Sequence, residues 1–317
     1  MFDIVALGEL LIDFTPNGFS DSGMHLFEQN AGGAPANMLT ACSKFGLKTG
    51  FIGKVGADMH GYFLKSTLEK QGIDTTGIVI DPNVFTTLAF VDLLENGERI
   101  FSFSRKPGAD TQLNEKELNL SLLSNTKIFH FGSLSLTDEP CRLSTKKAIQ
   151  YAKQHNVLIS YDPNYRSSLW KSEKAAKSQI RSHLSYVDIL KISDEETELL
   201  TDKKDPLLAA YDLIQHGISI VVVTLGSKGA LVCTKEGSLT VPGFPSSVVD
   251  TTGAGDSFWG GFLSQIIQTN KDILSLSLKE LEPCVRFANA VASLCITKHG
   301  GIPAIPTQNE VKIFLQK

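Results

Sequence analysis

Short apolar runs alternate with longer segments of helical spacing along most of the chain, and the alternation is most regular after residue 127. The run 218–225 consists mostly of β-branched residues, which is typical of a strand buried on both faces of a sheet. The expected strands are 2–7, 49–55, 128–134, 157–161, 187–192, 218–225, 230–233 and 239–241. The expected helices are 38–45, 60–71, 139–155, 174–184, 195–200, 206–216, 257–263, 281–298 and 309–315. Strands that alternate with helices predict an α/β fold in which helices cover both faces of a mostly parallel sheet.

A second pattern interrupts the first half of the chain. The β-rich runs 86–94 and 99–104 flank Glu95-Asn96-Gly97-Glu98, and Asn-Gly between two such runs predicts a hairpin. Because no helical pattern separates these runs, we expect residues 14–31 and 84–105 to form a small antiparallel accessory sheet. No linker-like segment divides the chain, so residues 1–317 are predicted to form a single domain that carries this sheet.

Composition narrows the class of protein. The chain is 42% hydrophobic and 20% charged, as is usual for globular proteins. Its formal net charge is −4 and its pI about 6.0, and the absence of a basic patch argues against a nucleic-acid partner. No apolar run approaches the roughly 18 residues of a transmembrane helix, and residues 1–8 lack the basic start of a signal peptide. The cysteines are odd in number and show no C-x-x-C spacing, so we expect buried thiols in a reducing cytoplasm.

Polar and glycine-rich residues cluster at the ends of the expected strands. The clusters are Asp13, residues 162–166, residues 191–196, residues 224–229 and residues 250–256. Any one of them is also what a solvent-exposed loop would contain. Because the carboxyl ends of parallel strands share one edge of a sheet, the five clusters together predict a single cleft there.

The richest cluster is Asp250-Thr251-Thr252-Gly253-Ala254-Gly255-Asp256, which an apolar helical run follows. Glycine amides at the start of a helix make an anion site, and a carboxylate inside that site suits phosphoryl transfer. The same residues also fit a glycine turn in which Asp256 caps the helix. Other motifs are excluded by spacing: there is no G-x-x-x-x-G-K-[ST] loop, Phe258 replaces the third glycine of G-x-G-x-x-G, and neither G-x-S-x-G nor H-E-x-x-H occurs.

These residues predict a kinase that acts on a polyhydroxylated small molecule. Asp13 and Asn37 offer carboxylate and amide groups that suit sugar hydroxyls. Asp256 would accept the hydroxyl proton, and the amides of Gly253 to Asp256 would stabilise charge on the transferred phosphoryl group. The same amides and the helix dipole are expected to keep Asp256 ionised and therefore to weaken it as a base.

Five motifs follow one another along the chain: Gly32-Gly33-Ala34-Pro35-Ala36-Asn37, Asp162-Pro163-Asn164-Tyr165-Arg166, Lys191-Ile192-Ser193-Asp194-Glu195-Glu196, residues 250–256 and Phe287-Ala288-Asn289-Ala290. One glycine-rich motif alone is weak evidence, but the ordered set is highly specific. It resembles the ribokinase-like (PfkB-type) sugar kinases along nearly the whole chain, with the fructokinases as the most similar members. The resemblance implies a ribokinase-like fold, ATP as phosphoryl donor and Mg²⁺ as cofactor.

The resemblance also implies roles for individual residues. Asp256 is the expected catalytic base, and Gly253, Ala254 and Gly255 form the expected anion hole. The expected sugar contacts are Asp13, Gly33, Asn37, Phe103, Arg105 and Arg166, and the accessory sheet that carries Phe103 and Arg105 acts as a lid in the family. The expected residues of the ATP site are Asp162, Lys191, Ser193, Glu196, Thr224, Gly226, Lys228, Gly229 and Asn289. Glu196 is also expected near Mg²⁺, and Asp250 and Thr252 at a site for a monovalent cation, usually K⁺.

Some of these assignments have structural alternatives. The wider family has Asn-x-x-Glu where this chain has Ser193-Asp194-Glu195-Glu196, and Ser-x-x-Glu is also a capping box. Within that motif Glu195 is expected to face solvent. Lys228 is equally typical of a solvated loop, Arg105 could decorate only the hairpin, and His130 is expected in the core.

The sequence therefore predicts an ATP-dependent fructokinase that converts D-fructose to fructose 6-phosphate. Aminoimidazole riboside kinase, 2-keto-3-deoxygluconate kinase and ribokinase share the chemistry and remain alternatives, since Arg105 and Arg166 could hold the carboxylate of a keto acid. A non-catalytic sugar or nucleotide sensor is a second class, against which the retained Asp256 argues. Heptads, repeats and charged tails are absent, which argues against a structural interaction protein. A lid with residues such as Phe90 and Phe101 would leave an exposed sheet edge, and this predicts a homodimer.

Overall fold

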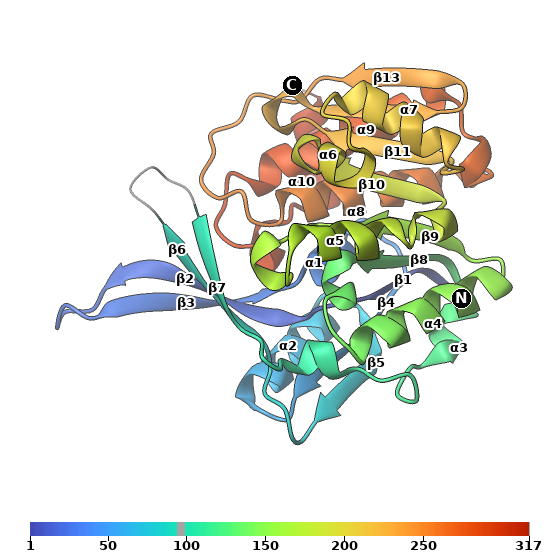
Figure 1. Ribbon diagram of the computed structural model, residues 1–317. Helices are drawn as coiled ribbons and strands as arrows, with labels where there is room; N and C mark the ends of the chain where they lie inside the picture. The colour runs from blue at the N-terminus through green and yellow to red at the C-terminus, as the bar shows by residue number, and fades with distance from the viewer. Residues whose placement is uncertain (94–98, 317) are drawn as a thin grey trace.

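A nine-stranded sheet forms the body of the molecule (Figure 1). The computed structural model describes residues 1–93 and 99–316. The strand order is β13-β12-β11-β10-β9-β8-β1-β4-β5, and all neighbours pair in parallel except β11 with β12 and β12 with β13. The strands are β1 (Phe2–Leu7), β4 (Thr49–Gly56), β5 (Asp74–Asp81), β8 (Thr126–Gly132), β9 (Leu158–Asp162), β10 (Ile189–Ser193), β11 (Ile220–Thr224), β12 (Ala230–Thr234) and β13 (Gly237–Val241). The predicted mostly parallel sheet is confirmed.

Helices cover both faces of this sheet, and β1 shows why each face is buried. Ile4 and Ala6 of β1 belong to the core under α1, α8 and α9, whereas Val5 and Leu7 belong to the core under α4, α5 and α7. Successive strand side chains point to opposite faces, so a strand covered on both sides is apolar throughout. The helices are α1 (Ala34–Lys44), α2 (Met59–Lys70), α3 (Leu120–Leu123), α4 (Cys141–Gln154), α5 (Glu173–Arg181), α6 (Thr197–Thr201), α7 (Pro206–Gln215), α8 (Ala254–Gln268), α9 (Leu278–Cys295) and α10 (Gln308–Leu315).

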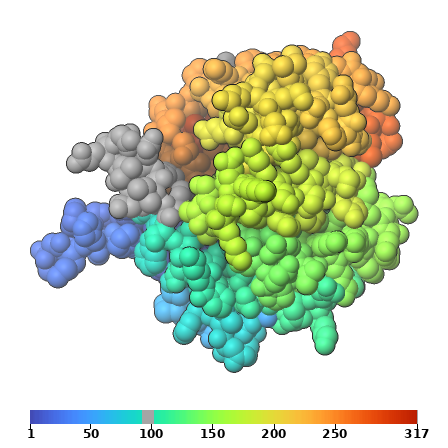
Figure 2. Space-filling view, in the orientation of Figure 1, coloured from blue at the N-terminus to red at the C-terminus, as the bar shows by residue number. Residues whose placement is uncertain are grey.

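A second sheet of four strands lies beyond the carboxyl ends of the main strands, where the tip of its β2–β3 pair projects from the body (Figures 1 and 2). Its order is β3-β2-β6-β7, formed by β3 (His25–Gly32), β2 (Leu11–Phe19), β6 (Leu88–Leu93) and β7 (Arg99–Ser104). We call this sheet the lid. The antiparallel prediction is confirmed for β2–β3 and β6–β7. It is wrong for β2–β6, which pair in parallel because the chain passes through the main sheet between them. The predicted Asn96-Gly97 turn lies outside the described residues.

Strand β5 was not predicted from the sequence. Its first half, Asp74-Thr75-Thr76-Gly77, carries no large apolar side chain, and it becomes a strand by pairing with β4 at the sheet edge. The capping box predicted at Thr307 and Glu310 is present at the start of α10. Within the described part of the chain, no helix has both the length and the apolar character required to cross a bilayer.

Candidate active site

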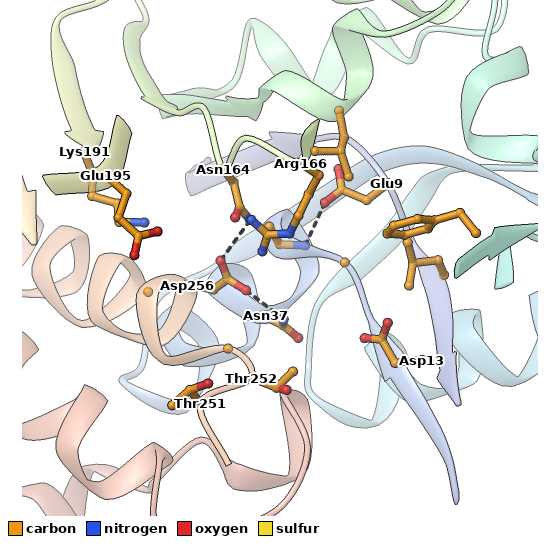
Figure 3. Close-up of a pocket in the computed structure, with 17 residues that line it drawn as sticks. Glu9, Asp13, Asn37, Asn164, Arg166, Lys191, Glu195, Thr251, Thr252 and Asp256 are labelled. Atoms are coloured by element: carbon orange, nitrogen blue, oxygen red, sulfur yellow. Dashed lines mark hydrogen bonds between the residues drawn. The ribbon is translucent and has the colours of Figure 1, made fainter. Parts of the chain in front are cut away.

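The first turn of α8 places Asp256 at the centre of the predicted cleft (Figure 3). Gly253 precedes the helix with φ 74°, a left-handed conformation that favours glycine. Asp256 Oδ2 accepts a hydrogen bond of 2.8 Å from Asn37 Nδ2, and Oδ1 accepts a longer one of 3.4 Å from Asn164 Nδ2. The amides of a first helical turn have no carbonyl partner within their own helix, so the turn presents donors beside this carboxylate.

Burial raises the pKa of the Asp256 carboxyl above its ordinary value, although the Asn37 hydrogen bond and the charges of Lys191 and Arg166 act to lower it. Burial therefore opposes the weakening of Asp256 as a base that the helix amides were expected to cause. Removal from water disfavours the charged carboxylate more than the surrounding donors and cations favour it. A buried carboxylate of raised pKa is better suited to accept a proton than an exposed one.

A cavity of about 570 Å³ opens beside Asp256, and we call it the acceptor cavity. It collects most of the predicted sugar and anion-hole residues: Asp13, Gly33, Asn37, Phe103, Arg166, Gly253, Gly255 and Asp256. Lys191 and Thr252 line it as well. The lining also includes residues to which the sequence analysis gave no role there: Glu9, Leu11, Ala34, Leu134, Asn164, Glu195 and Thr251. Ala34, Asn164, Glu195 and Thr251 were visible within motifs, whereas Glu9, Leu11 and Leu134 resemble ordinary loop or wall residues.

Glu9 and Gly33 fix the wall of the acceptor cavity at the start of α1. Glu9 Oε1 accepts a hydrogen bond of 2.8 Å from the Ala34 amide. Gly33 has φ 118°, and a Cβ at this position would collide with the Glu9 carbonyl oxygen, so glycine is required. Burial raises the pKa of Glu9 to about 7, and hydrogen bonds from its own amide and from Ala34 offset only part of that effect. A buried carboxylate directly after the first strand was a signal that the sequence analysis did not use.

Lys191 brings a positive charge to the anion hole. Its ammonium forms an ion pair of 2.8 Å with Asp162. It also lies against the α8 turn, since a Cβ added to Gly255 would be 3.0 Å from Lys191 Nζ. Burial raises the pKa of Asp162, and the positive charge of Lys191 opposes that rise. Lys191 was predicted to face the ATP phosphates and Asp162 to belong to the ATP site; the geometry places Lys191 beside the anion hole and Asp162 against it as its ion-pair partner.

Glu196 and Ser193 form the capping box that the sequence left as an alternative. Glu196 Oε2 accepts from the Ser193 amide at 2.8 Å, and Oε1 accepts from the Tyr165 amide at 2.7 Å. The adjacent Glu195 is exposed, as expected, and it also lines the acceptor cavity. The capping geometry turns Glu196 toward the backbone and leaves Glu195 as the carboxylate on the cavity side.

Six predicted ligand residues line neither the acceptor cavity nor a second cavity on the other side of the α8 turn: Arg105, Asp162, Ser193, Glu196, Lys228 and Asp250. Arg105 is buried and forms an ion pair of 2.7 Å with Asp110, and it does not line the acceptor cavity. Lys228 is exposed in the turn after β11 and does not line the second cavity described below. His130 lies in the core as expected, with Nδ1 3.0 Å from Ser160 Oγ, and burial lowers its pKa to about 3.

A second cavity of about 700 Å³ lies on the other side of the α8 turn, and we call it the nucleotide cavity. Thr251 and Gly255 line both cavities. Of the predicted ATP-site residues it contains Thr224, Gly226, Gly229 and Asn289, and the anion-hole residue Ala254 lines it too. Apolar walls that the sequence analysis missed are Phe244, Pro245, Val248, Phe258, Ala292 and Ile296. Such a cavity suits a planar base at one end and phosphates at the α8 turn.

Asp250 organises the loop before the anion hole. Its two carboxylate oxygens accept from the Thr252 amide at 2.7 Å and the Gly300 amide at 3.0 Å. A buried carboxylate is an oxygen ligand of the kind that a hard cation prefers. Among residues 1–93 and 99–316, no group of three or more His, Cys, Asp or Glu side chains could hold a metal by itself. Mg²⁺ does not require such a group, because phosphates and waters can supply most of its ligands.

Known proteins match this chain over almost its whole length. The family described as pfkB family carbohydrate kinase matches residues 1–308. A protein named probable fructokinase-3 from Arabidopsis thaliana is 44% identical over 316 residues, which cover 99% of this chain and 91% of that protein.

Solved structures show the same architecture. A fructokinase from Xylella fastidiosa with bound ATP superposes with a TM-score of 0.91 at 32% identity and covers 99% of this chain and 98% of its own. A double mutant of a fructokinase from Vibrio cholerae O395, in a form with fructose, ADP and potassium ion bound, has a TM-score of 0.89 at 32% identity with the same coverage. The fold is therefore ribokinase-like, as predicted.

Proposed function

The chain belongs to the pfkB family of carbohydrate kinases, and from this premise we propose that it is a fructokinase that transfers the γ-phosphoryl group of ATP to the 6-hydroxyl of D-fructose. Names of relatives at 43–44% identity over almost the whole chain support fructose as the acceptor. We further propose that residues 1–317 act as one kinase unit, with the lid as its cover over the sugar.

One observation carries the proposal: a single buried carboxylate, Asp256, lies on the helical turn that separates two cavities. The acceptor cavity offers carboxylate and amide side chains for hydroxyl groups. The nucleotide cavity offers apolar walls and glycine backbone. A phosphoryl group that passes between the cavities would cross the turn at Thr251 and Gly255, which line both.

In the proposed reaction, the fructose hydroxyl oxygen attacks the γ-phosphorus of ATP while the bond from phosphorus to the β–γ bridging oxygen breaks. Asp256 accepts the hydroxyl proton, and ADP leaves with the electrons of the broken bond. Amides at the start of α8 and the Lys191 ammonium stabilise charge on the transferred phosphoryl oxygens. Asn37 holds Asp256 Oδ2 through its 2.8 Å hydrogen bond and so orients the carboxylate.

Mg²⁺ bound to the ATP phosphates would neutralise part of their charge, and Glu195 is the carboxylate on that side of the cavity. Glu196 acts on the phosphate site through the backbone it holds at Ser193. Asp250, with backbone groups near Thr252, would hold K⁺ and keep the anion-hole loop in place.

We also propose a cytoplasmic homodimer that pairs through the lids. Large apolar lid residues are exposed, among them Phe19 (65%), Phe27 (46%) and Phe90 (40%). An open sheet with such side chains is a typical interface. All five cysteines are free and buried, which supports a reducing compartment. Light scattering at micromolar concentration tests the dimer, and a monomer mass would contradict it.

The function is tested by ADP release with purified protein, ATP and Mg²⁺ against fructose, aminoimidazole riboside, 2-keto-3-deoxygluconate and ribose. We expect the highest kcat/KM for fructose, with fructose 6-phosphate as the product identified by NMR. A strong preference for the riboside or the keto acid would replace fructose as the acceptor. Binding of sugar and ATP without turnover would favour the sensor instead.

A further inference from the structure

Strands β6 and β7 of the lid leave and rejoin the body of the molecule at one point. Thr87 directly precedes β6 and Arg105 directly follows β7. Both side chains bond to Asp110, in the short 3₁₀ helix Ala109–Gln112. We call Thr87, Arg105 and Asp110 the lid root. All three are at most 6% exposed, and none lines the acceptor cavity.

The guanidinium of Arg105 is fully engaged in holding this point together. Its Nε donates to Asp110 Oδ2 at 2.8 Å, and Nη2 lies 2.7 Å from the same oxygen. Nη1 donates to Thr137 Oγ1 at 2.9 Å, and Nη2 donates to the Leu134 carbonyl at 2.9 Å. Each guanidinium nitrogen thus has a protein partner, and the positive charge faces a buried carboxylate. This leaves Arg105 poorly placed to contact a sugar directly.

Asp110 joins the two lid strands through its two oxygens. Oδ2 accepts from Arg105 on the β7 side, and Oδ1 accepts from the Thr87 hydroxyl on the β6 side. Gly108 completes the packing, since a Cβ there would collide with the Thr87 hydroxyl. A single carboxylate therefore fixes the start of one lid strand against the end of the other.

The lid root is connected to the acceptor cavity in two directions. Phe103, two residues before Arg105, lines the cavity from the lid. Leu134, whose carbonyl accepts from Arg105, lines it from the body. The lid root thus lies between Phe103 of the lid and Leu134 of the body, which line the same cavity.

We propose that Asp110 is a positioning residue for acceptor binding, which through Arg105 and Thr87 holds Phe103 of the lid at the distance from Leu134 that encloses the sugar. The inference rests on the proposed function, since it concerns the same acceptor cavity. It predicts that loosening the root weakens sugar binding and leaves nucleotide binding unchanged, because no root residue lines the nucleotide cavity.

The test compares Thr87→Val and Asp110→Asn with two control variants outside the site. Thr87→Val keeps the side-chain shape and the Asp110–Arg105 pair but removes one hydroxyl. Thr126→Val is its matched control, because Thr126 is also buried and its hydroxyl bonds a carbonyl, that of Ile128. Thr126 begins β8, at the end of that strand remote from the cleft. Ile149→Val, in the core under α4, controls for loss of stability alone.

We expect the KM for the acceptor sugar to rise about 3- to 10-fold in Thr87→Val and at least about 10-fold in Asp110→Asn. The KM for ATP should stay within about twofold of the wild type in both, and the two controls should leave both constants unchanged. If the root variants lower the melting temperature but keep the sugar KM within twofold, the root serves stability only and the proposal fails.

Hydrogen exchange gives a readout that does not depend on turnover. In the unliganded protein, Thr87→Val should speed exchange of the described β6 and β7 amides relative to Thr126→Val, while β8 and β9 amides remain as protected as in the wild type. Unchanged lid exchange in Thr87→Val would overturn the proposal even if Asp110→Asn does not fold. If the wild type phosphorylates no sugar, the proposed function fails, and lid exchange still decides whether the root positions the lid.

Discussion

The acceptor cavity and the nucleotide cavity meet at the start of α8, but different kinds of chemical group line them. In the acceptor cavity the lining includes the carboxylates of Asp13 and Asp256, the amide of Asn37 and the cations of Arg166 and Lys191. The described residues that line the nucleotide cavity contribute mainly glycine backbone, small residues and apolar side chains, and none of them is charged. The acceptor cavity therefore offers a ligand polar and charged side-chain groups, whereas the nucleotide cavity offers its shape and main-chain amides.

The two cavities should therefore respond differently to substitution of the residues that line them. A hydrogen bond to a charged group contributes about 1.5–3 kcal/mol, whereas one between neutral groups contributes about 0.5–1.5 kcal/mol. Isosteric changes on the acceptor side should thus produce larger effects than equal changes on the nucleotide side.

Asp256→Asn should cost about two to four orders of magnitude in kcat, the usual scale for a positioned base or more. Asparagine keeps the size of the side chain but cannot accept the hydroxyl proton. ATP affinity should remain near that of the wild type, because the nucleotide cavity does not include Asp256. Coupled ADP-release assays and calorimetric titration with ATP measure the two quantities. Turnover close to normal would remove Asp256 from the role of base.

Asn37→Leu should lower kcat/KM for the sugar about 10- to 100-fold, because it deletes the 2.8 Å hydrogen bond to Asp256. It should also move the acid limb of the pH profile. Burial already raises the pKa of Asp256, and the Asn37 hydrogen bond is the strongest influence that lowers it. Without that bond the pKa rises further, so the base is protonated at a higher pH and activity is lost sooner as the pH falls.

The control for this shift is Asn164→Leu, whose contact with Asp256 is longer at 3.4 Å. Its acid limb should move less than that of Asn37→Leu in kcat/KM profiles recorded across the same buffers. Equal shifts, or none in either variant, would mean that the charges of Lys191 and Arg166, not Asn37, set the basicity of Asp256.

The same contrast explains how much of the site could be predicted from the sequence. Asn37 and Asp256 were predicted because they stand in glycine-rich motifs, where one sheet edge gathers them. Asp13 was predicted because it closely follows the first strand, but the structure places it within lid strand β2. Glu195 was missed because Ser193 and Glu196 form a cap, and only the geometry of that cap shows which neighbouring carboxylate faces the cavity.

The walls of the nucleotide cavity could not be predicted in the same way. Phe244, Val248 and Ile296 have no functional group, and in the sequence they look like any core residue. Which apolar residues line a cavity depends on tertiary packing that a pattern of hydrophobic positions does not record. The fold shows the same limit: alternation predicted the main sheet, but the edge strand β5 and the parallel β2–β6 pair arise from contacts between distant segments.

Asn289→Leu tests whether main-chain placement governs the nucleotide side. The Asn289 amide donates to the carbonyls of Val241 and Pro242 at 3.1 Å each, which holds the strand end that leads to Gly243 of the cavity wall. Loss of these bonds should raise the KM for ATP about 3- to 10-fold and leave the KM for the sugar within about twofold. A rise in the sugar KM alone would show that the two cavities are not separable.

Lys228→Ala should have the smallest effect. It tests whether a charged side chain contributes to ATP binding at the nucleotide cavity. The sequence allowed Lys228 to contact phosphate, but its side chain is exposed and the nucleotide cavity is lined by its neighbours Gly226, Ser227 and Gly229. We therefore expect the KM for ATP to change less than about twofold, as is usual for a surface charge, at both low and high salt. A KM that rises about tenfold at low salt, and less so at high salt, would place this lysine on the ATP phosphates. In that case the nucleotide cavity, like the acceptor cavity, would recognise its ligand with a charged side chain.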